Sequence, residues 1–154
     1  MNIDYAIAAI FGTFFLAIIL IGLASYVLTA FGLFTMAKNR DIENAWVAWV
    51  PVAQLYIVGK LIKTLNIAGY EIPQVELALP GIAVAGTVFN AVPLIGTLAS
   101  IASLIIGLFA LHKLYTLYRP DQATLYIILS IVLPFMGPIF IFLMRNDAMV
   151  YGEA

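Results

Sequence analysis

Long stretches without a charged residue are the feature that most constrains how this chain can fold. Four such runs cover residues 5–37, 44–59, 77–111 and 122–144. A helix needs about 20 mostly apolar residues to cross the hydrocarbon core of a bilayer, and three of the four runs are long enough. The composition agrees, because 64% of the residues are hydrophobic and 10% are charged, whereas soluble domains carry about 25% charged residues. We therefore expect an all-α integral membrane protein, with residues 1–154 forming one domain in the lipid bilayer.

The lengths of the runs predict four membrane-spanning helices. The first and last runs each predict one helix, over about residues 5–36 and 122–144. The run over residues 77–111 is too long for one straight span of about 30 Å, and it contains a turn signal at Asn90 and Pro93. Proline suits the first turn of a helix, where its missing N–H needs no partner. We therefore predict a helical hairpin over about residues 73–89 and 93–118, with its turn at Asn90 and Pro93.

The shorter run, residues 44–59, begins with two tryptophans and is broken by Pro51. Tryptophan and tyrosine favour the headgroup level of a membrane, and lysine side chains extend toward water there. We interpret residues 44–63 as a segment that lies at the interface or re-enters the membrane from one side. The predicted anchors of this segment are Trp46, Trp49, Tyr56, Lys60 and Lys63. A fifth, slightly short span is the alternative.

The basic residues predict the orientation, because lysine and arginine in short loops stay on the cytoplasmic side of a membrane. With four spans and an extracytoplasmic N-terminus, six of the seven basic residues fall inside and Arg145 falls outside. The six are Lys38, Arg40, Lys60, Lys63, Lys113 and Arg119. A fifth span would leave three inside and four outside, and a single crossing by residues 77–111 would leave five inside and two outside. The four-span arrangement predicts a multi-pass protein of the cell membrane with both chain ends extracytoplasmic.

The residues that enzymes and metal sites require are scarce in this chain. It has no cysteine and one histidine, His112, with no carboxylate three or four residues away along the helix. No ionisable residue falls deep within a predicted span, where a proton relay would need one. The basic residues form no stripe that could neutralise a nucleic acid backbone. We expect no enzymatic activity, no cofactor, no metal and no nucleic acid partner.

Small residues recur along one face of the predicted helix over residues 93–118. Gly96, Ala99, Ser103 and Gly107 would let two helix backbones approach closely, which favours helix association in lipid. A similar series in the first predicted helix consists of Ala9, Thr13, Ala17, Ser25 and Thr29. These faces either pack against each other within one bundle or contact a second copy or a partner protein.

Two prolines and a glycine interrupt the last predicted helix. Pro134 and Pro138 flank Gly137, and a proline cannot donate the usual backbone hydrogen bond and crowds a carbonyl one turn back. We predict a helix kink at these three residues, with freed carbonyls at and near Ser130. Such carbonyls coordinate ions in some transporters, so a plain kink and an ion site are both consistent with the pattern.

Two segments of the chain carry a resemblance to known sequences. In residues 38–60 a basic stretch leads into Trp46 and Trp49, followed by Val50-Pro51-Val52, Gln54 and Tyr56. In residues 115–146, Arg119-Pro120-Asp121 leads into a helix that contains Pro-Phe-Met-Gly-Pro. Both segments resemble small multi-spanning bacterial membrane proteins of uncharacterised families. The resemblance implies a membrane location and no particular activity.

These observations lead to two hypotheses about function. The first is a non-enzymatic membrane protein that acts through helix–helix contacts, as an accessory subunit or as a self-assembling homo-oligomer. The alternative is a small oligomeric channel or carrier with its path between protomers. The residues that would line this path are Asn90, Thr97, Ser100 and Ser103. The first hypothesis is favoured, because Gly96, Ala99 and Gly107 make the same face mostly apolar.

Overall fold

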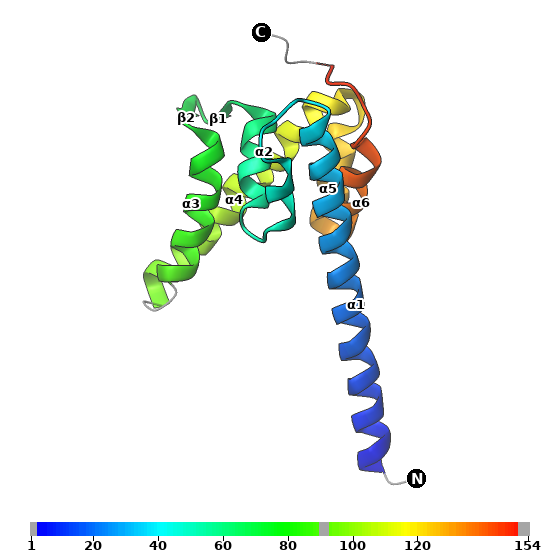
Figure 1. The fold of residues 1–154 in the computed structure, drawn as a ribbon. Helices are drawn as coiled ribbons and strands as arrows, with labels where there is room; N and C mark the ends of the chain where they lie inside the picture. The colour runs from blue at the N-terminus through cyan, green and yellow to red at the C-terminus, as the bar shows by residue number, and fades with distance from the viewer. Residues whose placement is uncertain (1–2, 90–92, 151–154) are drawn as a thin grey trace.

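The computed structural model describes residues 3–89 and 93–150, and it is mostly helical, as the sequence predicts (Figure 1). Its helices are α1 (Ile3–Lys38), α2 (Gln54–Ile62), α3 (Val75–Val88), α4 (Pro93–Tyr118), α5 (Ala123–Val132) and α6 (Met136–Met144). Short 3-10 helices cover Ala45–Trp49 and Pro120–Gln122, and strands β1 (Leu65–Ile67) and β2 (Tyr70–Ile72) form a hairpin. By length and composition, α1 and the Leu94–Tyr118 part of α4 are the two described helices that can cross a membrane.

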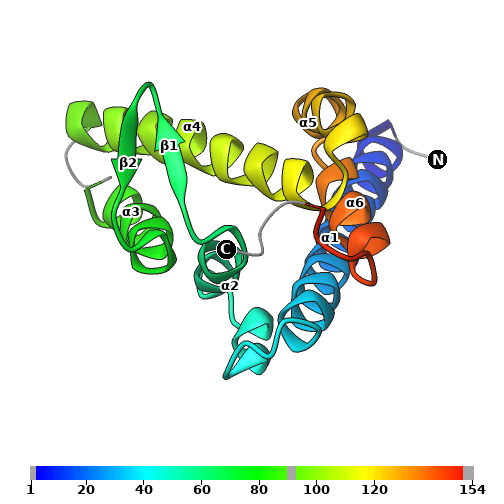
Figure 2. The ribbon, with the colours of Figure 1, turned by 90° about the horizontal axis from the view of Figure 1, so that it is seen from above.

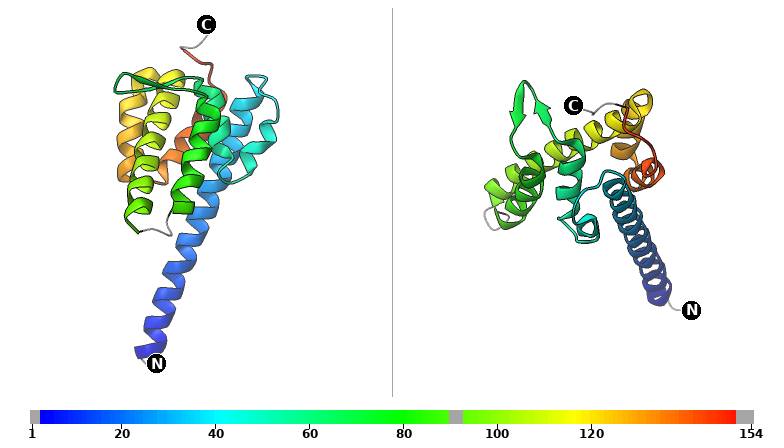
Figure 3. Two further views of the ribbon diagram at one scale, coloured as in Figure 1. Left: turned by 90° about the vertical axis from the view of Figure 1, so that its left-hand side faces the viewer. Right: turned by 45° about the horizontal axis from the view of Figure 1, so that its top comes forward.

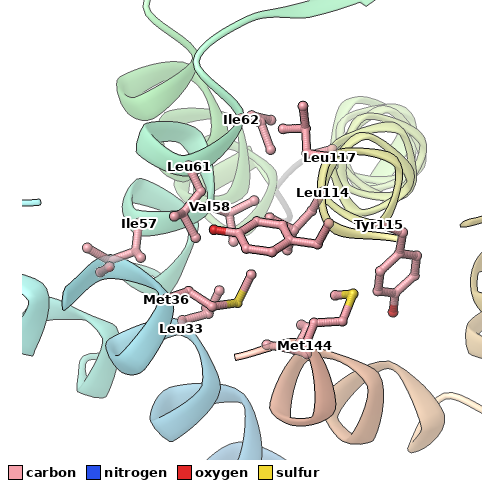
Figure 4. Close-up of a cluster of buried hydrophobic side chains, with 14 of the residues drawn as sticks. Leu33, Met36, Ile57, Val58, Leu61, Ile62, Leu114, Tyr115, Leu117 and Met144 are labelled. Atoms are coloured by element: carbon pink, nitrogen blue, oxygen red, sulfur yellow. The ribbon is translucent and has the colours of Figure 1, made fainter. Parts of the chain in front are cut away.

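The buried core lies at one end of the molecule, where α1 ends, α3 begins and α4 ends (Figures 1 and 4). Five helices contribute its largest fully buried side chains. These are Leu33 and Met36 of α1, Ile57 and Leu61 of α2, Val75 of α3, Leu114 and Tyr115 of α4, and Met144 of α6. Within lipid, such contacts stabilise a fold through close van der Waals packing rather than through the exclusion of water.

The first part of α1 stands apart from this core. Every side chain described between Ile3 and Ala24 is exposed, whereas Ala30, Leu33 and Met36 are fully buried. Figures 1 and 3 show the N-terminal part of α1 extending beyond the other helices. The helix is therefore packed near its C-terminal end and unpartnered over the rest of its length.

Two glycines allow neighbouring helices to approach closely at the core. A methyl group in place of a Gly59 hydrogen on α2 would lie 2.3 Å from the Glu76 Cα on α3. A methyl group at Gly32 on α1 would lie 2.9 Å from the Ile141 Cγ2 and 3.0 Å from the Ile141 carbonyl oxygen on α6. No real side chain tolerates the first distance, so the α2–α3 contact requires glycine at position 59.

Residues 44–63, which we call the tryptophan segment, enter the bundle and return to the end from which they came. Asp41, which follows α1, and Lys63, which follows α2, line the same surface cavity at that end. Between these two residues the chain runs along α1 toward its N-terminus, where the Tyr26 hydroxyl donates a hydrogen bond to the Trp49 carbonyl oxygen. Tyr26 precedes the end of α1 by 12 residues, which corresponds to about 18 Å of helix. Residues 44–63 thus form a short helical hairpin beside α1, and its two ends lie at the same end of the molecule.

The β-hairpin between α2 and α3 is absent from the sequence-based prediction. Its two-residue turn, Ala68 and Gly69, has positive φ at both positions, which matches the twist of paired strands. The Asn66 Oδ1 accepts a hydrogen bond of 3.0 Å from the Gly69 N–H and supports the turn. The signal in the sequence is a glycine-containing turn between two short alternating segments, and the long apolar runs on either side obscure it.

The last apolar run also reverses direction, contrary to prediction. Pro134 lies between α5 and α6, and Pro138 is the third residue of α6, where a missing N–H requires no intrahelical partner. The α6 helix therefore folds back along α5, and the rings of Tyr126 and Phe140 stack with centroids 3.9 Å apart. The predicted single kinked span over residues 122–144 is therefore wrong, because the prolines end one helix and begin another.

This reversal changes where the described chain ends. The Arg119 Nε lies 2.6 Å from the Asp147 Oδ2, and the Val150 N–H donates a 2.8 Å hydrogen bond to the Leu117 carbonyl oxygen. Residue 150 therefore lies at the core end, whereas α1 begins at the opposite end (Figure 1). The view from above shows α6 beside α1 (Figure 2). The prediction placed both chain ends on the same side, and the folding back of α6 is the reason for the difference.

We predict that Gly59→Ala lowers the free energy of unfolding by about 1–3 kcal/mol, because the added methyl group would overlap the α3 backbone. Gly22→Ala is the matched control, since no atom lies within 4 Å of the position of its added methyl group. The control should leave stability unchanged or raise it by up to about 1 kcal/mol. Unfolding in mild detergent, followed by circular dichroism, measures both; equal stability of the two variants would contradict the close α2–α3 contact.

Candidate functional site

The small-residue face of α4 meets α3 over part of its length. A methyl group at Gly86 of α3 would lie 3.7 Å from the Ala99 carbonyl oxygen, which is an ordinary van der Waals distance. Gly96 is buried and Ala99 is half-buried. Gly96 and Ala99 thus lie on the part of α4 that packs closely, in the first two turns of the helix. Pro93 begins α4, and Asn90, the other predicted turn residue, lies outside the described residues.

Farther along α4, the same face borders an open cleft instead of a helix contact. Ser103 and Gly107 line this cleft together with Ser100, and no atom lies within 4 Å of the position that a Gly107 methyl group would take. The cleft lies between α3 and α4, has a volume of about 470 Å³ and is lined mostly by leucine, isoleucine and alanine side chains. The four small residues therefore divide into a packed pair and a pair that faces open space.

Several helical hydroxyl groups are occupied by their own helices. The Thr13, Thr29 and Thr87 hydroxyls donate to the carbonyls of Ala9, Ser25 and Ala83, at 2.8, 2.9 and 3.1 Å respectively. A hydroxyl bonded in this way presents a small and largely apolar surface to a neighbour. These threonines therefore suit close helix contacts better than they suit a path for water or ions.

The predicted anchors of residues 44–63 have different environments. Trp46 is 60% exposed and Trp49 is 39% exposed, and Trp49 lies next to Tyr26 of α1. The Lys60 Nζ lies 5.5 Å from the centre of the Tyr56 ring and 3.9 Å from the Glu76 Oε1. Lys63 is exposed at the end of α2. The two lysines therefore lie at the core end, whereas Trp49 lies farther along α1.

A polar network fixes the α5–α6 hairpin to α4. Arg119 donates from Nε to the Asp147 carboxylate and from Nη1 to the Tyr126 hydroxyl at 2.9 Å, and Asp147 raises the pKa of Arg119. The Tyr115 hydroxyl lies 2.9 Å from the Ser130 Oγ, which itself donates to the Tyr126 carbonyl oxygen at 2.7 Å. Gly137 faces Ser130, since a methyl group there would lie 3.5 Å from its Oγ. Sequence reasoning missed this network because its members come from three helices and a terminal loop.

The described residues contain no group of three or more histidines, cysteines or carboxylates that could hold a metal ion. Comparisons with protein-family models, with curated proteins and with solved structures gave no match.

We predict that Trp49 lies deeper in a bilayer than Trp46. The Trp49 carbonyl oxygen accepts a hydrogen bond from Tyr26, which lies about 18 Å along α1 from the C-terminal end of that helix. The variants Trp46→Phe and Trp49→Phe each retain one tryptophan for fluorescence quenching by lipids brominated at defined depths. Bromine near the middle of the acyl chain should quench Trp49 more strongly than Trp46. Strongest quenching of both by labels near the headgroups would instead support a segment that lies flat at the interface.

Proposed function

We propose that this protein is a non-enzymatic, multi-pass membrane protein that assembles with a second copy of itself through α1. In the proposed arrangement α1, α3 and α4 cross the bilayer, while residues 44–63 and the α5–α6 pair enter it from the cytoplasmic side and return. The exposure of the N-terminal part of α1 is the observation that carries the proposal. An accessory subunit that pairs with a different membrane protein is the related alternative.

The distribution of basic residues supports the proposed orientation. All seven lysines and arginines lie at or within two helical turns of the core end of the molecule, which we call the charged end. They are Lys38, Arg40, Lys60, Lys63, Lys113, Arg119 and Arg145. Because α6 returns to this end, Arg145 joins the other six and no basic residue is left at the far end. Basic residues in short loops stay in the cytoplasm, so the charged end is assigned to the cytoplasmic face.

The length of α1 supports a protein contact in addition to lipid. Its uncharged stretch, residues 5–37, would measure about 50 Å as a straight helix, against about 30 Å of hydrocarbon. A tilt of about 53° would be needed to place all of it within the hydrocarbon, whereas observed tilts reach about 40°. Part of this apolar surface therefore extends past the hydrocarbon when the core lies in the same bilayer. A second helix beside it would remove that surface from water.

One face of the unpartnered part of α1 is suited to such a helix. Ala9, Thr13 and Ala17 lie one turn apart on the same face, and the Thr13 hydroxyl is already bonded to the Ala9 carbonyl oxygen. Phe11 and Phe15 lie on the opposite face, where large side chains suit contact with lipid. Small residues at a spacing of four allow two parallel helices to approach closely. A parallel pair related by twofold symmetry would bring each of these residues next to its equivalent.

The cleft between α3 and α4 gives weaker support to a channel or carrier. Ser100 and Ser103 line it, but most of its lining is apolar. The Thr87 hydroxyl at its edge is bonded within its own helix. A conducting path needs polar groups along its length to replace the water around a solute. Assembly through α1 is therefore the function that the described geometry favours.

Single introduced cysteines test the proposed orientation, because the natural chain has no cysteine that could be labelled instead. An impermeant thiol reagent added to intact cells should label Asp4→Cys. It should label Asn66→Cys and Asn146→Cys only after the membrane is made permeable. Labelling of Asn146→Cys in intact cells would restore the crossing of residues 122–144 and contradict the return of α6.

We predict that oxidation of single-cysteine variants in native membranes forms disulfide-linked dimers with helical periodicity along α1. Cross-linking should be strong at positions 9, 13 and 17 and weak at positions 11 and 15, because only the first three lie on the small-residue face. A product of twice the chain mass supports the homo-oligomer, and a product of another mass supports the accessory subunit. Uniformly weak cross-linking would contradict assembly through this face.

A matched pair of substitutions separates helix contact from a general effect of size. Ala9→Leu places a bulky side chain on the proposed contact face, whereas Ala8→Leu makes the same change on a different face of the same turn. The first should convert dimers to monomers in native mass spectrometry from mild detergent, and the second should leave dimers intact. Equal behaviour of the two variants would count against the proposed face.

A further inference from the structure

A cavity with two arginines lies at the charged end, between the end of α1, the end of α4 and the residues that follow α6. Its volume is about 470 Å³, and its lining includes Asn39, Arg40, Tyr118, Arg145 and Asp147. We call it the arginine cavity. The two arginines are far apart in the sequence, and the return of α6 to the charged end brings them to the same cavity. A single crossing by residues 122–144 would have separated them by the thickness of the membrane.

Neither arginine of the cavity is neutralised by a carboxylate in the described part of the chain. The ion pairs there are Lys60 with Glu76 and Arg119 with Asp147. Arg40 donates from Nη1 to the thioether sulfur of Met149, and a thioether is a weak acceptor. A guanidinium group has five N–H donors, so Arg40 retains several for a ligand.

Arg145 is held in place without a charged partner. Its Nη1 donates to the Phe142 carbonyl oxygen at 2.7 Å, and its guanidinium lies 3.8 Å from the centre of the Phe142 ring. The Asn39 side chain donates a 3.1 Å hydrogen bond to the Arg145 carbonyl oxygen, which joins the end of α6 to the end of α1. These contacts position Arg145 beside the cavity and leave most of its donors for another acceptor.

Asp147 does not cancel the positive charge of the cavity. Its Oδ2 accepts a hydrogen bond of 2.6 Å from the Arg119 Nε, so its charge is balanced by an arginine other than Arg40 and Arg145. Tyr118 also lines the cavity, but its hydroxyl is enclosed by the surrounding residues and is not open to a ligand. An anion with several acceptor oxygens would complement the remaining guanidinium donors of Arg40 and Arg145.

We propose that the arginine cavity binds a phosphate group, with Arg40 and Arg145 as its principal ligands. The planar guanidinium groups match the oxygen geometry of phosphate and form charge-assisted hydrogen bonds to it. The group can belong to an anionic phospholipid headgroup or to free phosphate. A lipid source depends on the membrane orientation proposed above, whereas phosphate binding as such does not. The proposal is also independent of assembly through α1, because the cavity lies at the other end of that helix.

Binding measurements on the full-length protein in mild detergent test this proposal. Short-chain phosphatidylglycerol, short-chain phosphatidylcholine and inorganic phosphate are the three probes. The wild-type protein should bind phosphatidylglycerol more tightly than phosphatidylcholine. The double variant Arg40→Gln, Arg145→Gln should bind phosphatidylglycerol about tenfold or more weakly, which corresponds to the loss of at least one charge-assisted hydrogen bond.

The double variant Lys38→Gln, Lys63→Gln is the matched control, because it removes the same charge from the same end but spares the cavity. Its affinity for phosphatidylglycerol should stay within about threefold of the wild type, since exposed charges act weakly at physiological salt. Competition by inorganic phosphate at equal concentration would support free phosphate as the natural source, and its failure to compete would support the lipid. The proposal would be overturned if the two double variants lost affinity for phosphatidylglycerol equally. It would also be overturned if the wild type bound neither inorganic phosphate nor phosphatidylglycerol more tightly than phosphatidylcholine.

The variant Arg40→Lys keeps the test valid if the double arginine variant is unstable. It preserves the charge, and the only hydrogen bond it removes within the described chain is the one to Met149. Loss of the planar guanidinium should weaken the binding of phosphatidylglycerol by several-fold. Thermal unfolding without a probe should be the same as that of the wild type. Unchanged affinity in this folded variant would contradict phosphate binding by Arg40.

Discussion

Close contacts between helix backbones at the charged end hold this structure together. Gly59 lets α2 touch the start of α3, and Gly32 lets α1 touch α6. In the membrane location proposed above, lipid provides no hydrophobic drive between helices, so contact of this closeness is what makes packing favourable. The tryptophan segment lies beside α1, and α6, which returns to the charged end, completes the core around Met36 and Met144. The remaining apolar surface of α1, α3 and α4 is left for lipid or for another chain.

The return of α6 connects the fold to its charge distribution. It places Arg145 and Asp147 beside the ends of α1 and α4, where Asp147 pairs with Arg119. All the basic residues then lie at one end, a simpler arrangement than the predicted division of six and one. The same return forms the arginine cavity. Thus a reversal at Pro134 determines the proposed orientation, the polar network of α5 and the proposed phosphate site.

The two ends of α1 serve different purposes in the function proposed. Its C-terminal part belongs to the core, whereas every side chain described between Ile3 and Ala24 is exposed. A helix built in this way can join the core to a neighbouring subunit without disturbing that core. The proposed phosphate site lies at the charged end, away from the exposed part of α1. The Thr13 hydroxyl is bonded within its own helix and the cleft between α3 and α4 is mostly apolar, and both features favour assembly over transport.

Sequence alone was sufficient to predict the helical character, the long first helix and the helix from Pro93 to Tyr118, because uncharged length and proline position are local properties. It also left a re-entrant path open for residues 44–63. It could not show that Pro134 reverses the chain, since a kinked helix and a helical hairpin share the same local pattern. It missed the β-hairpin, the contact at Gly59 and the placement of Arg40 and Arg145 at the same cavity. These depend on which helices become neighbours, and only tertiary packing decides that.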